Sequence, residues 1–309
     1  MTPRDHGGGL DAAIARYGGA RKDWLDLSTG INPVAYPLPD LAPDAWTALP
    51  DARAQNDLID VARRFWQVPD GTDILAAPGS SCLITQMPRL ASSGRVRIDA
   101  PTYNEHAAAF QAQGWQIAVE ATDARVIVHP NNPTGAFWDG ADDSDLLLID
   151  ESFCDIQPEQ SLISRVTDGR TIVLKSFGKF WGLAGLRLGF AIGDPALISR
   201  LRDWLGPWPV SGPALSIGAQ ALSDPDWAKQ TRIRLKTDAA RLDQLMTNGG
   251  AQVKGGTSLF RLYTVDNAAK WQDQLAENHV WSRIFPYSKT WLRLGLPAPN
   301  RWDQLQAAL

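Results

Sequence analysis

Short apolar runs alternate with helix-like segments through the middle of the chain. An amphipathic pattern over 51–67 predicts one helix, and the segments 81–91 and 104–113 are similar. The apolar runs end in small, polar or proline residues and are predicted to be buried strands: 73–78, 95–101, 115–120, 124–130, 145–150 and 171–176. This alternation predicts an α/β domain with a mostly parallel sheet, whose ligand site lies at the carboxyl ends of the strands.

The pattern changes beyond about residue 215. One long helix is predicted up to Gly249 and Gly250, followed by the strand-like runs "SLFRLYTV" and "WLRLGLP" with a helix pattern at 267–279 between them. We therefore expect a smaller α+β domain. The expected division is an N-terminal segment over 1–45 that contributes to the small domain and the active site, a large domain over 46–215 and a small domain over 216–309.

Composition excludes several classes of protein. The chain has 309 residues, 44% of them hydrophobic, and a formal net charge of -4, so the basic surface of a nucleic-acid-binding protein is not expected. It has neither a signal-peptide pattern nor an apolar run long enough to span a membrane, which predicts a cytoplasmic protein without a membrane partner. Cys82 and Cys154 are expected to be reduced, buried thiols rather than a disulfide or a metal site.

Residues that could hold a ligand follow several of the predicted strands. Gly79, Ser80 and Ser81 open a helix, where free N–H groups and hydroxyls suit a phosphate, although a plain N-cap explains them equally simply. Tyr103 could stack on a flat ring or fill the domain edge. Asn132 stands in a proline-rich turn and could bond a ligand oxygen or serve the turn alone.

Charged residues stand in apolar surroundings after the last two strands. Asp150 ends "DLLLID", and Lys179 and Arg187 lie, after Ser176, in the stretch "SFGKFWGLAGLRLGF". A buried charge destabilises the fold unless it is paired or chemically used, so these residues predict a charged ligand. Pyridoxal 5'-phosphate (PLP) would satisfy all of them, because it has a phosphate, a flat ring, a basic ring nitrogen and an aldehyde that accounts for the lysine.

The motifs "HPNNPTG", "LLLIDES" and "SFGKFWGLAGLRLGF" resemble those of fold type I PLP-dependent transferases, the class I/II aminotransferase family. The resemblance implies that Lys179 forms the Schiff base with PLP and moves a proton at the substrate Cα. It also implies that Tyr103 stacks on the ring, Asn132 bonds the ring hydroxyl and Asp150 pairs with the pyridine nitrogen. The residues it assigns to the phosphate are Gly79, Ser80, Ser81, Ser176 and Arg187.

The N-terminal elements "HGGG" and "DLSTGINP" resemble those of the L-threonine-O-3-phosphate decarboxylases of cobalamin (vitamin B12) biosynthesis, which make (R)-1-amino-2-propanol O-2-phosphate. The resemblance implies that His6 and Asn32 contact the phosphate of a small phosphorylated amino acid, and that Arg293 binds its α-carboxylate. Arg283 is a further candidate for the carboxylate or the phosphate. From the residues alone, His6 could equally belong to a flexible end, Asn32 to a turn and Arg283 to the surface.

Two positions depart from related families. Histidinol-phosphate aminotransferases usually have tyrosine where Phe153 stands, whereas phenylalanine occurs in the decarboxylases. Leu49 replaces a tyrosine that reaches the PLP phosphate of a partner subunit, so that contact is not implied here, although the resemblance still implies a homodimer. The alternative activity is that of histidinol-phosphate aminotransferase or a related PLP-dependent aminotransferase. A non-catalytic PLP-binding protein is a rival that leaves Lys179 unexplained.

Overall fold

The computed structural model describes residues 4–120 and 123–309, and the chain divides into two compact units. The large unit comprises residues 36–132 and 137–229. The small unit comprises the chain up to Ala35, residues 133–136 and residues 230–309. Within the described ranges, each helix is too short or too polar to cross a membrane.

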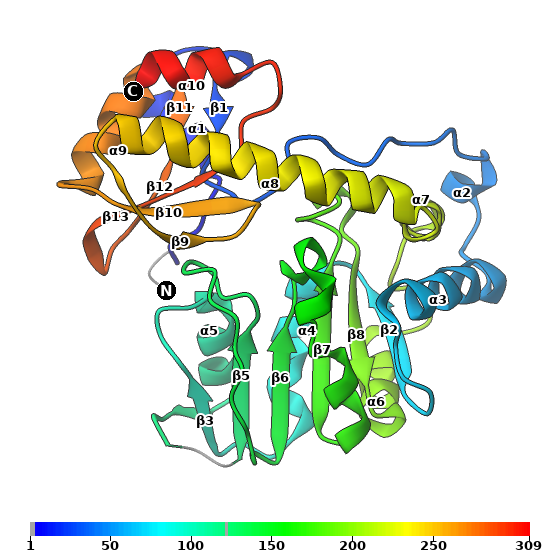
Figure 1. The fold of residues 1–309 in the computed structure, drawn as a ribbon. Helices are drawn as coiled ribbons and strands as arrows, with labels where there is room; N and C mark the ends of the chain where they lie inside the picture. Colours follow the sequence, from blue (N-terminus) through cyan, green and yellow to red (C-terminus); the bar gives the residue numbers. More distant parts are fainter. Residues whose placement is uncertain (1–3, 121–122) are drawn as a thin grey trace. The chain divides into compact units, whose positions relative to one another are not determined.

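A seven-stranded sheet forms the centre of the large unit (Figure 1). Its strand order is β2-β8-β7-β6-β5-β3-β4, and β8 runs antiparallel to both of its neighbours while the other paired strands are parallel. The sheet is therefore mostly parallel, as the sequence predicts. Its strands are β2 (Asp73–Ala77), β3 (Arg95–Ile98), β4 (Gln116–Ile117), β5 (Ala124–Val128), β6 (Leu146–Asp150), β7 (Thr171–Ser176) and β8 (Gly189–Gly193).

Helices cover this sheet because its central strands are apolar on both faces. Every residue of β5, β6 and β7 is buried, which is typical of parallel strands covered on two sides. On one face, Leu83, Phe110 and Ile198 from three helices join a single apolar core with strand residues. The helices of the unit are α2 (Asp44–Thr47), α3 (Ala52–Trp66), α4 (Ser80–Gln86), α5 (Asn104–Ala112), α6 (Pro195–Leu205), α7 (Gly212–Leu222) and the first turn of α8 (Pro225–Asn248).

Two expectations for the large unit are wrong. The run 115–120 was expected to be a buried strand, but β4 contains only Gln116 and Ile117, and both are exposed because they pair at the edge of the sheet. Cys154 is buried as expected, whereas Cys82 is only half-buried because it lies in the first turn of α4. Both cysteines are free thiols.

The small unit contains two sheets and the greater part of α8. One sheet is antiparallel, in the order β12-β13-β10-β9, and the other pairs β1 with β11 in parallel. The predicted long helix is α8, which ends at Asn248, directly before the two expected glycines. The remaining elements are α1 (Leu10–Tyr17), β1 (Leu25–Asp26), β9 (Gln252–Gly256), β10 (Phe260–Thr264), α9 (Ala268–Glu277), β11 (Val280–Trp281), β12 (Arg283–Phe285), β13 (Ser288–Gly295) and α10 (Trp302–Ala308).

Candidate active site

A cavity opens in the large unit where β5, β6 and β7 end. The carboxyl ends of parallel strands meet at one edge of a sheet, so the loops that follow them converge there. Eight of the residues that the sequence analysis assigned to PLP line this cavity, and Gly79 caps the helix that begins with two of them. The cavity is lined by Ser80, Ser81, Tyr103, Val128, Asn132, Asp150, Ser152, Phe153, Ser176, Gly178, Lys179, Ala184 and Arg187.

Asp150 is the buried carboxylate of the cavity, with 3% of its surface exposed. Its Oδ2 lies 2.9 Å from His106 Nε2, and its Oδ1 accepts hydrogen bonds from the N–H and hydroxyl of Ser152 at 2.9 and 2.5 Å. Burial alone would raise the pKa of Asp150, but His106 and Ser152 more than offset it, so the pKa lies below its ordinary value. The cavity therefore presents an ionised carboxylate.

His106 is a site residue that the sequence reasoning missed. It lies on α5, one turn after Tyr103, and only 1% of its surface is exposed. Its Nδ1 is buried without a hydrogen-bond partner among the described residues, while Nε2 bonds Asp150. The sequence does contain a signal for this residue. A buried Asp150 requires a cationic or hydrogen-bond-donating partner, and the chain has only four histidines that could serve as one.

Gly79 and Arg187 fit together at the start of α4. Gly79 has φ +86°, and a Cβ at this position would collide with the Arg187 guanidinium, so only glycine leaves the arginine its place. Arg187 itself has φ +53°, an uncommon conformation for a residue other than glycine. A guanidinium thus reaches the cavity beside the hydroxyls of Ser80, Ser81 and Ser176, which is a donor set suited to a phosphate.

The structure corrects which cation of this region is buried. Arg187 is exposed and Lys179 is half-buried, because both open onto the cavity rather than into the core. The Lys179 ammonium lies 5.4 Å from the centre of the Phe153 ring. The fully buried cation is Lys175, four residues earlier in β7, with 2% of its surface exposed.

Lys175 belongs to a buried ionic network behind the cavity. Its Nζ lies 2.5 Å from Glu151 Oε2 and 3.7 Å from Asp155 Oδ1. Glu151 also accepts from Ser161 Oγ at 2.7 Å and from the N–H of Leu162 at 2.6 Å. Since Glu151 and Lys175 directly adjoin Asp150 and Ser176, this network fixes the two strand ends that carry the site.

His129, Glu151 and Cys154 place three potential metal-ligating atoms within 4.8 Å of one another. The His129 ring is already fully used, because Nδ1 accepts from the N–H of Trp138 at 3.0 Å and Nε2 therefore donates to the carbonyl of Gln160 at 2.7 Å. Burial raises the pKa of the Cys154 thiol, which keeps it protonated. The group is a hydrogen-bonded part of the core and does not fit a cation.

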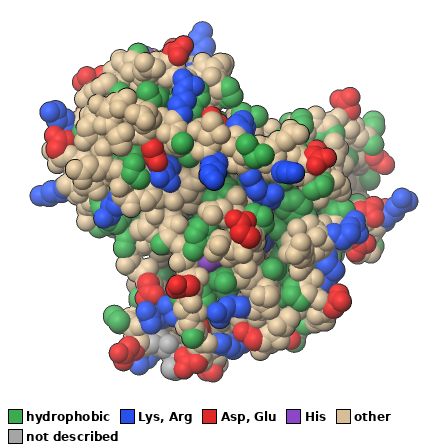
Figure 2. Space-filling view, viewed as in Figure 1, with side chains coloured by type: hydrophobic (Ala, Val, Ile, Leu, Met, Phe, Trp, Pro, Cys, Tyr) green, Lys and Arg blue, Asp and Glu red, His purple; other side chains and the backbone are tan. Residues whose placement is uncertain are grey.

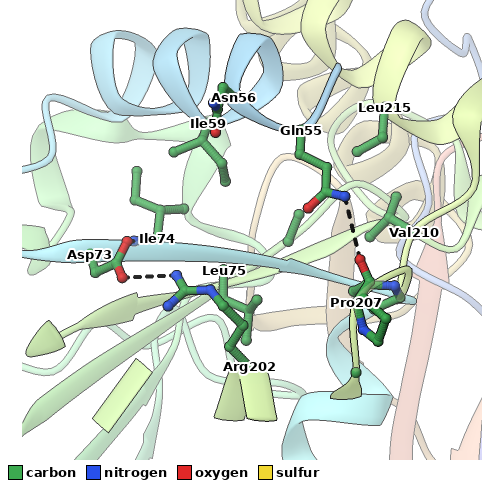
Figure 3. A pocket seen from close by; sticks show the side chains of 13 residues that line it. Gln55, Asn56, Ile59, Asp73, Ile74, Leu75, Arg202, Pro207, Val210 and Leu215 are labelled. Carbon is green, nitrogen blue, oxygen red and sulfur yellow. Dashed lines mark hydrogen bonds and ion pairs between the residues drawn. The ribbon is translucent and has the colours of Figure 1, made fainter. Parts of the chain in front are cut away.

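A second cavity of the large unit lies between α3, β2 and the loop after α6 (Figure 3). Two of its polar lining groups bond each other, since Arg202 Nη2 lies 2.8 Å from Asp73 Oδ2. Gln55 Nε2 donates to the Pro207 carbonyl at 3.4 Å. This second cavity shares no lining residue with the cavity around Lys179.

The surface of the large unit carries charges of both signs. On the face drawn in Figure 2, acidic and basic side chains are interspersed over the described part of this unit.

Two of the residues proposed to bind substrate form an arginine pair in the small unit. Arg283 on β12 and Arg293 on β13 are direct partners in the strand register. Arg293 is 4% exposed and donates to the Ser28 carbonyl at 2.7 Å, while Arg283 Nη2 lies 2.7 Å from Asp5 Oδ2. Burial and the neighbouring Arg283 lower the pKa of Arg293 to about 9. Two adjacent guanidinium groups of this kind favour an anionic ligand.

The N-terminal segment is held against the same unit. Gly8 donates to Ser28 Oγ at 2.7 Å, and Trp281 Nε1 donates to the Gly8 carbonyl at 2.9 Å. His6, two residues earlier, is exposed, whereas Asn32 is buried with 2% of its surface exposed. The structure therefore places His6, Asn32 and the arginine pair in one unit.

Comparisons with known proteins agree with this architecture. Residues 118–308 match the family described as aminotransferase class I and II. The chain is 41% identical to a threonine-phosphate decarboxylase of Sinorhizobium over 97% of this chain and 95% of the relative. The chain belongs to the class I and II aminotransferase family.

One further relative and one solved structure extend the comparison. A threonine-phosphate decarboxylase of Pseudomonas aeruginosa is 37% identical over 99% of this chain and 97% of its own length. The fold is that of a solved histidinol-phosphate aminotransferase from Sinorhizobium meliloti in complex with pyridoxal-5'-phosphate, with a TM-score of 0.79 at 19% identity. That alignment covers 100% of this chain and 96% of the other.

The cavity of this aminotransferase family member fits PLP by its own chemistry. The glycine at position 79 leaves room for a guanidinium beside three hydroxyls, as a phosphate requires. The ionised Asp150 suits a protonated ring nitrogen, and the amine of Lys179 opens onto the same space. Tyr103 and Asn132 provide an aromatic face and an amide.

Proposed function

We propose that the chain is a PLP-dependent threonine-phosphate decarboxylase, which converts L-threonine O-3-phosphate to (R)-1-amino-2-propanol O-2-phosphate and carbon dioxide. The observation that carries this conclusion is its likeness, over nearly the full length of both chains, to two proteins named threonine-phosphate decarboxylase. The cavity around Lys179 supplies the chemistry that such a reaction needs.

The cofactor is PLP. When bound, it accepts the electron pair released as a bond at the substrate Cα breaks. Asp150 serves this step because its ionised carboxylate holds the proton on the ring nitrogen, and His106 and Ser152 keep it ionised. We assign the phosphate to Gly79, Ser80, Ser81, Ser176 and Arg187, and the ring contacts to Tyr103 and Asn132.

Lys179 moves the proton in this proposal. Its amine opens onto the cavity beside the apolar ring of Phe153. After the α-carboxylate leaves as carbon dioxide, Lys179 delivers a proton to Cα in its place. In the small unit, we assign His6 and Asn32 to the substrate phosphate and Arg293 to its α-carboxylate, with Arg283 as a further candidate for either group.

The decisive experiment uses PLP-loaded protein and L-threonine O-3-phosphate labelled with ¹³C at the carboxyl group. Release of labelled carbon dioxide without any keto acid supports decarboxylation. Turnover only after 2-oxoglutarate is added, or turnover of histidinol phosphate instead, would assign the protein as a histidinol-phosphate aminotransferase. Lys179→Ala is the matched control, since it should remain folded and bind PLP without turnover.

We also propose that the protein is a homodimer whose second copy covers an apolar surface of the large unit. Trp46, Leu49 and Trp208 are 70%, 67% and 55% exposed, and Leu49 lines a hollow between α2 and α7. We take these large exposed apolar side chains as part of the proposed interface, where aromatic residues are enriched. Sedimentation should give twice the chain mass, and Trp46→Glu with Leu49→Glu should give monomers; a monomeric wild-type protein would contradict the proposal.

Three further expectations belong to this proposal. We assign the protein to the cytoplasm, in keeping with its two free thiols, and to cobalamin biosynthesis. Cell fractionation and the growth of a deletion strain without cobalamin test these assignments. The domain boundaries at 45/46 and 215/216 stay predictions, for which limited proteolysis is the test.

A further inference from the structure

The side-chain amide of Asn32 has a fixed orientation in the small unit. Its Oδ1 lies 3.0 Å from the backbone N of Val34 and 2.8 Å from Arg234 Nη2. Both of these groups are donors only, so the atom that faces them must be the amide oxygen. The other polar atom of the side chain is the NH₂ group, which can only donate.

Arg234 is itself held in place for this contact. It lies on α8 with 26% of its side chain exposed, and its Nη1 lies 3.4 Å from Asp238 Oδ2, one turn further along the helix. Burial lowers its pKa, while Asp238 acts in the opposite direction. A guanidinium that is partly buried and directed at an amide oxygen suggests a specific role, because the same charge on the solvent side of α8 would be better hydrated.

We propose that Arg234 is a positioning residue that locks Asn32 as a hydrogen-bond donor toward the phosphate of the substrate. This inference rests on the proposed function, in which Asn32 contacts that phosphate. Phosphate oxygens accept hydrogen bonds and do not donate them when fully ionised. An amide turned by 180° would therefore present its oxygen to the phosphate and repel it.

Arg234 acts on substrate choice through Asn32. It removes the unfavourable orientation of Asn32, since a turned amide would bring an NH₂ group against two donors. Arg234 therefore selects phosphorylated substrates over their unphosphorylated counterparts.

The test compares Arg234→Met with Lys236→Met in the PLP-loaded protein. Lys236 is an exposed lysine on the same helix, so the control removes the same charge without touching Asn32. Arg234→Met should raise KM for L-threonine O-3-phosphate by about tenfold or more and leave kcat within about threefold, since the contact is made equally in the ground state and the transition state. Inorganic phosphate should lose inhibitory strength in parallel. Equal KM values in the two variants would overturn the proposal.

Two substitutions of Asn32 show whether Arg234 acts by positioning Asn32 or through a general effect on the structure. With Asn32→Ala already present, Arg234→Met should raise KM no further, because the two residues act as one unit. An undiminished effect of Arg234→Met in that background would refute action through Asn32. Asn32→Asp keeps the pairing with Arg234 but has no N–H to donate, so it should raise KM as much as Asn32→Ala does, and a KM close to wild type would also refute the proposal.

Failure of the proposed function is recognised separately. If wild-type protein releases no carbon dioxide from L-threonine O-3-phosphate but transaminates histidinol phosphate, the decarboxylase assignment fails. The same variants are then assayed with histidinol phosphate, which also has a phosphate monoester. A KM effect confined to Arg234→Met would still support its role toward phosphate, and its absence would overturn that role.

Discussion

Glu151→Gln is expected to destabilise the large unit far more than removal of a surface ion pair. Glu151 and Lys175 are 1% and 2% exposed, and among the described residues the substitution leaves Asp155, at 3.7 Å, as the ion-pair partner of the Lys175 ammonium. Burial alone would lower the pKa of Lys175, but Glu151 and Asp155 raise it above its ordinary value, so the lysine is charged at neutral pH. Gln keeps the volume of Glu, which isolates the effect of charge.

The expected loss of unfolding free energy in Glu151→Gln follows from the burial of the ion pair. Breaking a buried ion pair by removing one partner typically lowers the free energy of unfolding by about 3–5 kcal/mol. With a urea dependence of about 2–3 kcal/mol per molar, the unfolding midpoint should fall by about 1–2 M. Trp66 and Trp181 donate to Asp155 beside the lysine, so tryptophan fluorescence reports on this network during unfolding.

Asp73→Asn is the matched control in the same unit. The Arg202–Asp73 pair has an N–O distance of 2.8 Å, but its side chains are 45% and 31% exposed. Exposed pairs contribute less than about 1 kcal/mol, because water screens them. Equal midpoint shifts for the two variants, with unchanged denaturant dependence, would refute the argument that burial sets the energy of the Glu151–Lys175 pair.

Three further substitutions test the site. His106→Asn should raise the pKa of Asp150, because the histidine helps to lower it, and so move the acid limb of the turnover profile to higher pH. Gly79→Ala should weaken PLP binding by about tenfold or more in titrations of the apoprotein, since the new methyl group displaces Arg187 and φ is positive. Arg293→Met should lower kcat/KM by about a hundredfold or more while the ligand-free protein unfolds no earlier, because burial and the neighbouring arginine already disfavour this charge.

Each of these predictions has an outcome that contradicts it. A pH profile of His106→Asn that falls uniformly without moving would mean that the histidine does not act through Asp150. Unchanged PLP affinity in Gly79→Ala would refute the argument that PLP binding depends on the close fit between Gly79 and Arg187. Early unfolding of ligand-free Arg293→Met would show that this arginine stabilises the fold rather than serving a ligand.

Local pattern alone predicted much of this protein. The apolar runs that became β5, β6 and β7 are recognisable because strands buried on both faces need an unbroken hydrophobic stretch. Asp150 and Ser176 end two of these strands and Lys179 follows shortly after, which brought all three to one cavity, since parallel strands end at the same edge. The same reasoning gave a wrong prediction for the short edge strand β4, which was expected to be longer and buried. Its residues form a strand because they pair with β3 and not because they are buried.

Tertiary structure alone decided the partners of the charged groups. Sequence predicted that Asp150 needs a positive or donating neighbour, but only the packing of α5 on the sheet brings His106 to it from 44 residues away. Likewise, Lys175 reads as one more residue of an apolar strand until the fold sets it against Glu151. Hydrophobic periodicity is a property of neighbouring residues in the chain, whereas the pairing of a buried charge depends on residues that only folding brings together.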